Sequence, residues 1–285
     1  MTISQALAAA TLALQKKSDP TAVLDAEILL AWAIKKTREY VFSRAESPLP
    51  PAVLRHYRRL VTRRAQGEPV AYLTKQKEFY GLYFFIDKNV LVPRPETELL
   101  VEAVISSSLE LGVKNPTMAD IGTGSGCIAV ALAKYLPVAK IIASDASAKA
   151  LAVAKKNAKR HQAKIQFYHG DLLKPLKNIE IDIMAANLPY GWRVWKNNSK
   201  MPQKSLKFEP PEALFTGEKG LSHYRRLFIQ IAARGQKPQF IICEFDPRQT
   251  KAIKIMAEKY LPNYCQKIKK DLAGLNRILS LKLKP

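Results

Sequence analysis

Four consecutive residues, Asn187-Leu188-Pro189-Tyr190, carry groups that could hold a planar nitrogen for chemistry. An amide or an exocyclic amine has two N–H groups, and two acceptors can fix it: the side-chain oxygen of Asn187 and the main-chain carbonyl of Leu188. Tyr190 can then pack against the planar group. These contacts make the nitrogen a better nucleophile, so the motif indicates group transfer by alignment, with neither a metal nor a covalent nucleophile. The alternative is an ordinary Asn-x-Pro turn.

A second candidate site is a glycine-rich loop after an expected strand at residues 117–121. Glycines permit positive backbone angles and let a ligand approach the main chain closely. The spacing here is Gly-x-Gly-x-Gly, whereas the dinucleotide fingerprint is Gly-x-Gly-x-x-Gly, and this difference favours S-adenosylmethionine. A nicotinamide dinucleotide site and a purely structural turn are the alternatives. The candidate cofactor-binding residues in the loop are Asp120, Gly122, Thr123, Gly124, Ser125 and Gly126.

Two aspartates end the next expected strands. Asp145 lies about 20 residues downstream of the loop, where its carboxylate can accept hydrogen bonds from both ribose hydroxyls. Asp171 can accept a hydrogen bond from an adenine amino group, with Leu172 against the ring. Taken singly, Asp145 could be a helix cap and Asp171 a turn residue. Together with the loop, they are three signals at the ends of three successive strands, and they predict one cofactor site.

Strands and helices alternate along the part of the chain that must position these residues. We expect helices at residues 127–135 and 148–160, and strands at 117–121, 140–144, 165–169, 181–186, 240–244, 265–269 and 277–283. Such alternation predicts an α/β fold with a mainly parallel, doubly wound sheet. Ligands of such sheets bind at the carboxyl ends of the strands, where all the motifs above lie.

The chain divides into three regions by pattern. Residues 1–75 have apolar residues at helical spacing and predict a small helical domain. Residues 76–92 are rich in aromatic and β-branched residues and predict a β-hairpin linker with its turn at Asp87-Lys88-Asn89. Residues 93–285 form the α/β domain, whose first helix starts near Thr97, a candidate N-cap.

The composition is that of a folded protein that is not exported. Hydrophobic residues make up 47% of the 285 residues, which is enough for a full core. The three cysteines lie far apart without Cys-x-x-Cys spacing, so we expect neither disulfides nor a metal site. No basic leader or long apolar run is present, so we expect no membrane association and a cytoplasmic monomer.

The chain is strongly basic, with a formal net charge of +22. Such a charge attracts polyanions, so nonspecific association with nucleic acid or the ribosome is one interpretation. The other is a lysine-rich surface that reflects the composition of the host. Residues 191–208 contain no acidic residue and combine two tryptophans with five basic residues: Trp192, Trp195, Arg193, Lys196, Lys200, Lys204 and Lys207.

Several segments together resemble the HemK/PrmC family, the protein-(glutamine-N5) methyltransferases that modify the Gly-Gly-Gln glutamine of peptide chain release factors. The most family-specific segment is Pro93-Arg94-Pro95-Glu96-Thr97-Glu98. The others are the glycine loop, residues 187–190, Gly67-Glu68-Pro69-Val70-Ala71-Tyr72, Glu78-Phe79-Tyr80-Gly81-Leu82, Phe208-Glu209-Pro210 and Asp271-Leu272-Ala273-Gly274-Leu275-Asn276-Arg277.

The resemblance implies a class I (Rossmann-like) methyltransferase domain with a mainly parallel seven-stranded sheet. By the same resemblance, residues 122–126, Asp145, Leu172 and Asn187 would contact S-adenosylmethionine. Residues 187–190 would bind the substrate glutamine, and the helical N-terminal domain would help to hold the release factor.

The chain departs from the family in two places. Leu188 replaces the first proline of an Asn-Pro-Pro-Tyr motif, so the carbonyl is kept but the fixed φ of proline is lost. Asp246-Pro247 stands where a glycine-containing turn is frequent, at a place that we expect to lie away from the chemistry.

Other functions are open from the sequence. The same site could methylate a ribosomal-protein glutamine, or an adenine or guanine amine in nucleic acid, since basic and aromatic residues together suit stacked bases. A binding protein for RNA or the ribosome with an inactive methyltransferase site is a third interpretation, against which the intact glycine loop counts.

Overall fold

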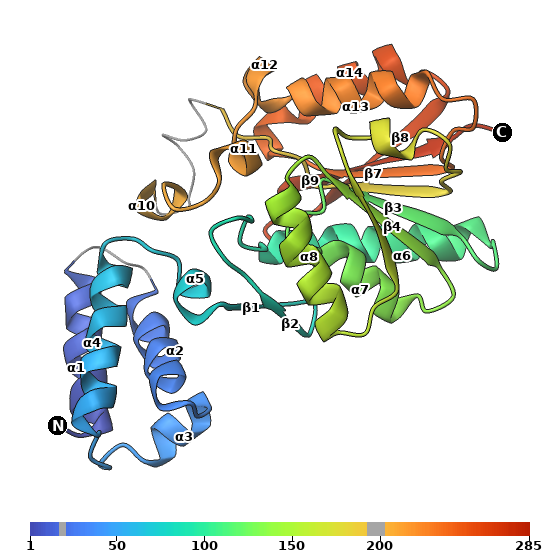
Figure 1. The fold of residues 1–285 in the computed structure, drawn as a ribbon. Helices are drawn as coiled ribbons and strands as arrows, with labels where there is room; N and C mark the ends of the chain where they lie inside the picture. The colour runs from blue at the N-terminus through green and yellow to red at the C-terminus, as the bar shows by residue number, and fades with distance from the viewer. Residues whose placement is uncertain (17–20, 193–202) are drawn as a thin grey trace. The chain divides into compact units, whose positions relative to one another are not determined.

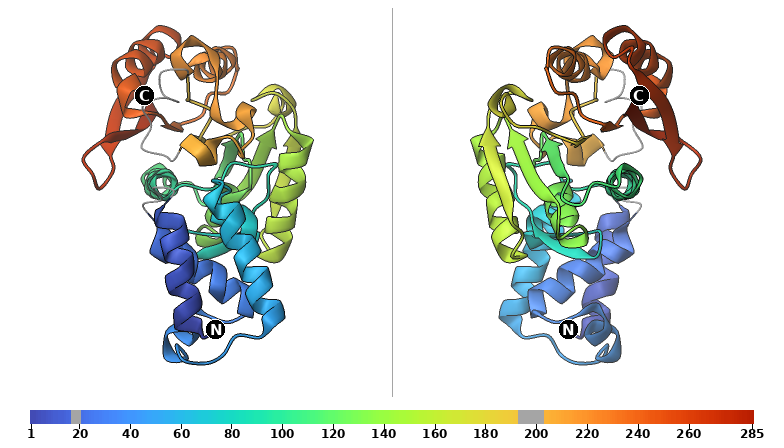
Figure 2. Two further views of the ribbon diagram at one scale, coloured as in Figure 1. Left: turned by 90° about the vertical axis from the view of Figure 1, so that its left-hand side faces the viewer. Right: turned by 90° about the vertical axis from the view of Figure 1, so that its right-hand side faces the viewer.

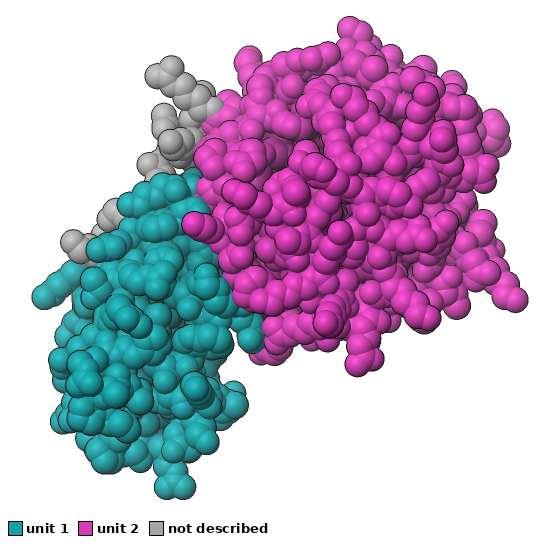
Figure 3. Space-filling model, viewed as in Figure 1, with its two compact units in different colours: residues 1–76, 198–208 teal, residues 77–197, 209–285 magenta. Residues whose placement is uncertain are grey.

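A computed structural model describes residues 1–16, 21–192 and 203–285 of the chain. They form two compact units, which Figure 3 distinguishes by colour. Unit 1 comprises Met1–Gln76 and Asn198–Phe208, and unit 2 comprises Lys77–Asn197 and Glu209–Pro285. Among the described residues, no helix is both long enough and apolar enough to span a membrane.

Unit 1 is helical, as the apolar spacing predicts. Its helices are α1 (Ile3–Gln15), α2 (Ala22–Ile34), α3 (Arg38–Ser43), α4 (Pro51–Ala65), α5 (Val70–Thr74) and α10 (Gln203–Leu206). A capping box at Thr2 starts α1, with reciprocal hydrogen bonds to Gln5. Inside the unit, buried Arg64 donates from Nε to Asp25 at 2.7 Å, and the Tyr57 hydroxyl donates to the Ala26 carbonyl at 3.0 Å. These pairings satisfy the polar groups that the core encloses.

A two-stranded hairpin, β1 (Gln76–Phe79) and β2 (Leu82–Phe85), follows. The turn that joins the strands is at Tyr80-Gly81, both with positive φ, so the prediction that the hairpin turns at Asp87-Lys88-Asn89 is wrong. Two positive φ angles give the two-residue turn that matches strand twist. The carboxylates of Glu98 and Glu78 accept the N–H groups of Tyr80 and Gly81. Asp87 instead makes a local turn, accepting the Asn89 N–H at 2.9 Å.

A seven-stranded sheet forms the centre of unit 2, and the predicted α/β fold is confirmed. The strand order is β5-β4-β3-β6-β7-β9-β8, with only β9 antiparallel to its neighbours. The strands are β3 (Thr117–Ile121), β4 (Lys140–Asp145), β5 (Ile165–His169), β6 (Ile183–Ala186), β7 (Phe240–Glu244), β8 (Tyr264–Lys270) and β9 (Asn276–Leu283). Every residue of β6 and β7 is buried, as expected for central parallel strands.

Helices cover both faces of this sheet (Figure 1). On one face lie α6 (Glu98–Leu111), α7 (Cys127–Tyr135) and α8 (Ala148–Arg160), and on the other α13 (Ser222–Ala232) and α14 (Thr250–Tyr260). Short helices make the connections: η1 (Pro95–Thr97), η2 (Lys174–Leu176), η3 (Pro247–Gln249), α11 (Pro211–Leu214) and α12 (Gly217–Gly220). Burial of the apolar faces of these helices against the strands leaves the carboxyl ends of β3 to β7 to carry polar residues.

Candidate active site

The predicted site residues all lie at one edge of the sheet. The glycine loop follows β3, Asp145 ends β4, Asp171 follows β5, and Asn187 follows β6. Because β3 to β7 run parallel, their carboxyl ends meet at the same edge. Residues that are 67 positions apart at the extremes, from Asp120 to Asn187, are therefore brought together.

The glycine loop has the left-handed backbone that its sequence allows. Gly122, Gly124 and Gly126 have φ angles of +73°, +54° and +79°. A Cβ on Gly122 would lie 2.8 Å from Cδ2 of Leu188. The loop is therefore in direct contact with residues 187–190, which we call the acceptor motif. A Cβ on Gly124 would meet nothing within 4 Å, which leaves room for a ligand beside the main chain.

Asp145 ties the loop to the neighbouring strand. Its Oδ2 accepts the Gly124 N–H at 2.8 Å and its Oδ1 accepts the Ser147 N–H at 2.8 Å. Burial raises the pKa of Asp145, and the two main-chain hydrogen bonds oppose that shift. The N-cap of α8 is Ser147, whose hydroxyl accepts the Ala150 N–H, so Asp145 is not the cap of that helix. Each carboxylate oxygen keeps a second lone pair for a ligand hydroxyl.

Asp120 is a fully buried carboxyl beneath the loop. Its Oδ2 accepts the Thr123 hydroxyl at 2.5 Å and the Ala129 N–H at 3.2 Å. Its Oδ1 has no hydrogen-bond partner among the residues that the structure describes. Burial raises the pKa of the Asp120 carboxyl to about 7. An acceptor without a donor in such a place is costly and suits a bound group that brings its own donor.

Asp171 is less free than the sequence suggested. Its carboxylate pairs with Arg226 of α13 and with Lys174 at 3.2 Å. Partial burial would raise the pKa of Asp171, but the hydrogen bonds from Arg226 and Lys174 outweigh it, so the pKa is lowered. The adjoining Leu172 is buried with φ +52°, and its carbonyl accepts the Ser144 hydroxyl. Contact of Asp171 with an adenine amine stays a prediction.

The amide of Asn187 has a fixed orientation. Its Nδ2 donates to Oγ1 of Thr97 at 3.0 Å, so its Oδ1 is the end that points elsewhere. Thr97 occupies the N-cap position of α6, as expected, but its hydroxyl makes no cap hydrogen bond. The same hydroxyl instead serves Asn187, 90 positions away.

Glu244, which the sequence analysis missed, is a buried residue next to the acceptor motif. It ends β7, is 1% exposed, and its Oε1 accepts the Tyr190 hydroxyl at 3.0 Å. Burial raises the pKa of Glu244, while the neighbouring hydroxyls of Thr97 and Tyr190 and the charge of Arg277 oppose that shift. The carboxylate therefore fixes Tyr190 directly, and its Oε2 has no hydrogen-bond partner among the described residues. The available signal was an acidic residue that ends the apolar run 240–243.

The main chain of the motif is equally constrained. The Leu188 N–H donates to the Tyr224 hydroxyl at 3.1 Å, and that hydroxyl donates to the Glu244 carbonyl. The Tyr190 carbonyl accepts from Nε2 of Gln249 at 3.0 Å, and a Cβ on Gly220 would collide with that carbonyl. Within the described chain, neither Oδ1 of Asn187 nor the Leu188 carbonyl receives a hydrogen bond. These are the two acceptors that the motif predicts.

The segment that resembles the family most is held next to this motif. Oε1 of Glu209 accepts from Arg94 at 2.5 Å, and Oε2 accepts the Val92 N–H at 3.0 Å. Glu209 is buried, so its carboxylate fixes the chain before η1. That pairing connects Pro-Arg-Pro-Glu-Thr-Glu with Phe208-Glu209-Pro210, two segments that are more than 100 residues apart.

The departure at Asp246-Pro247 lies next to the site rather than away from it. Asp246 caps η3 and pairs with Arg248 at 2.7 Å, and the Arg248 guanidinium lies over the Trp192 ring at 4.9 Å. Trp192 follows Tyr190 by two positions, so this turn packs against the chain that directly follows the acceptor motif. Most of the basic stretch lies outside the described residues or side chains: Arg193, Trp195, Lys196, Lys200 and Lys204.

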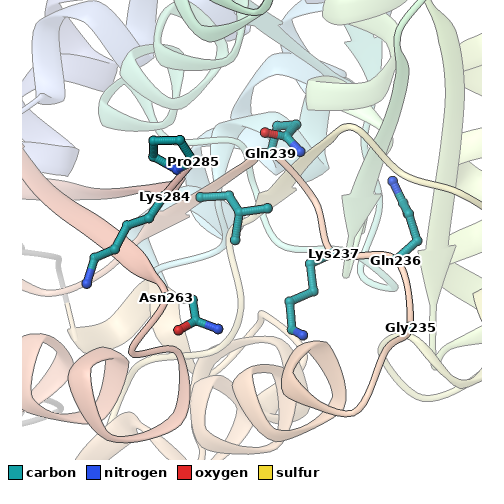
Figure 4. Close-up of a pocket in the computed structure, with 8 residues that line it drawn as sticks. Gly235, Gln236, Lys237, Gln239, Asn263, Lys284 and Pro285 are labelled. Atoms are coloured by element: carbon teal, nitrogen blue, oxygen red, sulfur yellow. The ribbon is translucent and has the colours of Figure 1, made fainter.

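A cavity of about 650 Å³ lies at the opposite edge of the sheet (Figure 4). It contains none of the predicted site residues. Its lining consists of Gly235, Gln236, Lys237, Gln239, Asn263, Leu283, Lys284 and Pro285.

The fold and the site together define a class I methyltransferase. The PrmC N-terminal domain model matches residues 5–74, and the methyltransferase small domain model matches residues 95–201. The chain belongs to the release factor glutamine methyltransferase family. Release factor glutamine methyltransferase of Koribacter versatilis is 39% identical over 235 residues, which is 81% of each chain. That of Moorella thermoacetica is 36% identical over 281 residues, which is 97% of each chain.

Solved structures agree on the fold. The hMettl16 catalytic domain in complex with an RNA hairpin has a TM-score of 0.58 at 16% identity, covering 89% of this chain and 90% of that chain. A T. thermophilus 16S rRNA guanine methyltransferase has a TM-score of 0.51 at 16% identity, covering 73% of this chain and 50% of that chain. At these identities the likeness concerns the fold alone.

We predict that Glu244→Gln lowers kcat by about 10- to 100-fold, because an amide must turn one N–H toward Tyr190 or Thr97 and so disturbs the alignment. The KM for the methyl donor should change little. Initial-rate kinetics of the variant measure both constants. The same substitution at an exposed residue of α14, Glu258→Gln, is the control and should leave both unchanged. An unchanged kcat would contradict it.

The same variant should gain stability relative to the wild type as pH rises. Burial raises the pKa of Glu244 in the folded state, so its contribution to stability is present at low pH and is lost as pH rises through the folded pKa. Glutamine does not titrate. Urea unfolding between about pH 5 and about pH 8 should show the free-energy difference moving in favour of Glu244→Gln. Movement the other way would show that the carboxylate is stabilised by its site.

Leu188 and Tyr224 should be energetically coupled. Tyr224→Phe leaves the buried Leu188 N–H without its acceptor, at a cost of about 1–3 kcal/mol. In a Leu188→Pro background there is no N–H to satisfy, so the same substitution should cost about 1 kcal/mol less. Tyr264→Phe, whose hydroxyl donates to the Pro238 carbonyl, is the control and should be additive. Additivity for Tyr224 as well would rule out the coupling.

Proposed function

We propose that this protein transfers a methyl group from S-adenosylmethionine to the side-chain amide nitrogen of the glutamine in the Gly-Gly-Gln motif of a peptide chain release factor. The observation that carries the proposal is the pair of acceptors, Asn187 Oδ1 and the Leu188 carbonyl, that no described residue uses. They match the two N–H groups of one primary amide. The names of the relatives, release factor glutamine methyltransferase, support the choice of substrate.

The glycine loop, Asp120 and Asp145 suit the cofactor. The space beside Gly124 admits the ligand, the Asp145 carboxylate can bind ribose hydroxyls, and the Asp120 Oδ1 can accept from a donor of the ligand. Asp171 and Leu172 would lie on the adenine side. When bound, S-adenosylmethionine supplies an electrophilic methyl group, whose C–S bond breaks with its electron pair kept by sulfur as the N–C bond forms.

The residues of the chain perform the rest by positioning and polarisation. The side-chain oxygen of Asn187 and the carbonyl of Leu188 accept hydrogen bonds from the two amide N–H groups. These hydrogen bonds raise the electron density on the nitrogen and turn its lone pair toward the methyl group. Tyr190, with its hydroxyl fixed by Glu244, packs against the amide plane. The methylated nitrogen then gives one proton to solvent.

The helices of unit 1 would supply further contacts to the release factor, and the three cysteines, all free thiols, favour the cytoplasm as the compartment. A ribosomal-protein glutamine or a nucleobase amine would present the same two N–H groups to the site. The competing substrates therefore need to be compared directly.

Labelled S-adenosylmethionine should methylate purified release factor, and not ribosomal subunits or DNA assayed in parallel, with the label on the Gly-Gly-Gln glutamine by mass spectrometry. Asn187→Ala should lower turnover about 100-fold or more, because one of the two aligned acceptors is lost, while cofactor affinity changes little. Asn263→Ala, an exposed asparagine at the other edge of the sheet, is the control. Label only in nucleic acid would disprove the proposed substrate.

We also propose nonspecific association with nucleic acid, for which α4 provides the observation. Arg55, Arg58 and Arg59 are exposed along this helix and make no ion pair with any described residue. Cations one helical turn apart can follow a phosphate backbone, and each contact releases counterions.

Changing these three arginines to glutamine should reduce the salt dependence of duplex binding, with the slope of log K against log salt falling by about 2 to 3. Fluorescence anisotropy across a salt series measures it. Glutamine at Lys251, Lys254 and Lys259, three exposed lysines of α14, removes equal charge elsewhere. Equal effects of the two triple variants would show that net charge, and not the α4 face, governs binding.

A further inference from the structure

The tip of the β8–β9 hairpin lies at the same edge of the sheet as the acceptor motif. β9 runs antiparallel to β7, with Ile278 opposite Glu244, and the Phe245 N–H donates to the Arg277 carbonyl at 2.9 Å. The chain from Ile278 back to Ala273 extends the hairpin by up to about 16 Å beyond Glu244, at about 3.3 Å per residue. Figure 2 shows this loop projecting from the rest of unit 2.

The tip is held rigidly by one side chain. Oδ1 of Asp271 accepts the N–H groups of Ala273 at 3.0 Å and Leu275 at 2.9 Å, and its Oδ2 pairs with Nε of Arg277 at 2.8 Å. Its main chain adds a hydrogen bond in each direction, to Gly274 and to Leu275. A loop fixed in this way loses little conformational entropy when a partner binds.

This rigid tip presents an apolar side chain to solvent. Leu272 is completely exposed, at 110% of its reference area, and Leu275 is 39% exposed. Scattered exposed leucines are ordinary, but Leu272 lies in a fixed turn that projects beyond the edge of the sheet that carries the acceptor motif. Arg277 lies at the base of the tip, where its carbonyl accepts the N–H of Phe245, the residue that follows Glu244. The tip is therefore physically continuous with the acceptor site.

We propose that Leu272, presented by the turn of residues 271–275, is a docking anchor for the folded body of the protein substrate, outside the segment that carries the glutamine. The inference rests on the proposed function. The turn presents a leucine to solvent at its point, and its acidic group is already paired with Arg277, so the partner that we propose is a protein surface with an apolar pocket for this side chain. The two acceptors at residues 187 and 188 read only the amide, and contacts beyond it must distinguish one protein from another.

The test compares whole release factor with a short Gly-Gly-Gln peptide as substrates. Leu272→Ser should raise the KM for the whole protein about 10-fold or more, as expected for loss of one buried leucine, and leave kcat and the peptide KM unchanged. Leu272→Met should keep the KM for the whole protein close to that of the wild type, because methionine is also a large apolar side chain. Leu109→Ser is the matched control, because Leu109 is 76% exposed and lies near the end of α6 at the other edge of the sheet.

An unchanged KM for the whole protein in Leu272→Ser would overturn the docking role. An equal rise for protein and peptide would also overturn it, because the leucine would then act on the glutamine site itself. If the wild type methylated neither substrate, the proposed function would fail instead, so the two failures are distinguishable. Thermal unfolding of each variant checks that the fold is unchanged.

Discussion

The buried carboxylate of Glu244 is the constraint on which the geometry of the site depends. A carboxyl group with 1% exposure requires hydrogen-bond partners, and the Tyr190 hydroxyl donates to its Oε1, while the Thr97 hydroxyl is near enough to oppose the rise of its pKa. The strand pairing of β7 between β6 and β9 fixes where this carboxylate lies. Beside this carboxyl group, the Thr97 hydroxyl accepts from Nδ2 of Asn187, and the Asn187 oxygen is left for a ligand. Tyr190 and Asn187, the two ends of the motif, are thus each oriented by one side-chain hydrogen bond next to this carboxyl group.

Close packing adds a second constraint, which joins the cofactor loop to the acceptor motif. Gly122 leaves only enough space for the Leu188 side chain, and Gly220 leaves only enough for the Tyr190 carbonyl. A side chain at either glycine would displace the motif, in addition to the strain of a positive φ. The two halves of the site therefore hold each other at a fixed separation, which methyl transfer between two bound molecules requires.

Much of this architecture could be predicted from the sequence, because it depends on local pattern. β3, β5 and β7, with α7 and α8, have the bounds that their apolar runs and flanking turns predicted. The roles of Glu244 and Thr97 were not predictable in this way, since their partners are 54 and 90 positions away and only the strand order brings them together. The Asp171–Arg226 pair and the turn at Tyr80-Gly81 have the same origin in tertiary contacts.

Position 188 shows how a departure from a family motif can be accommodated. A proline there would fix φ and reduce the freedom of the unfolded chain, an effect of about 0.4–1 kcal/mol. Leucine gives up that restriction but brings an N–H, which donates to Tyr224, and a side chain that is buried against Gly122. A hydrogen bond of this kind contributes about 0.5–1.5 kcal/mol, which is comparable with what proline would have contributed. The Leu188 carbonyl is available to a substrate in either case, so the chemistry depends on the main chain and the side chain is free to differ.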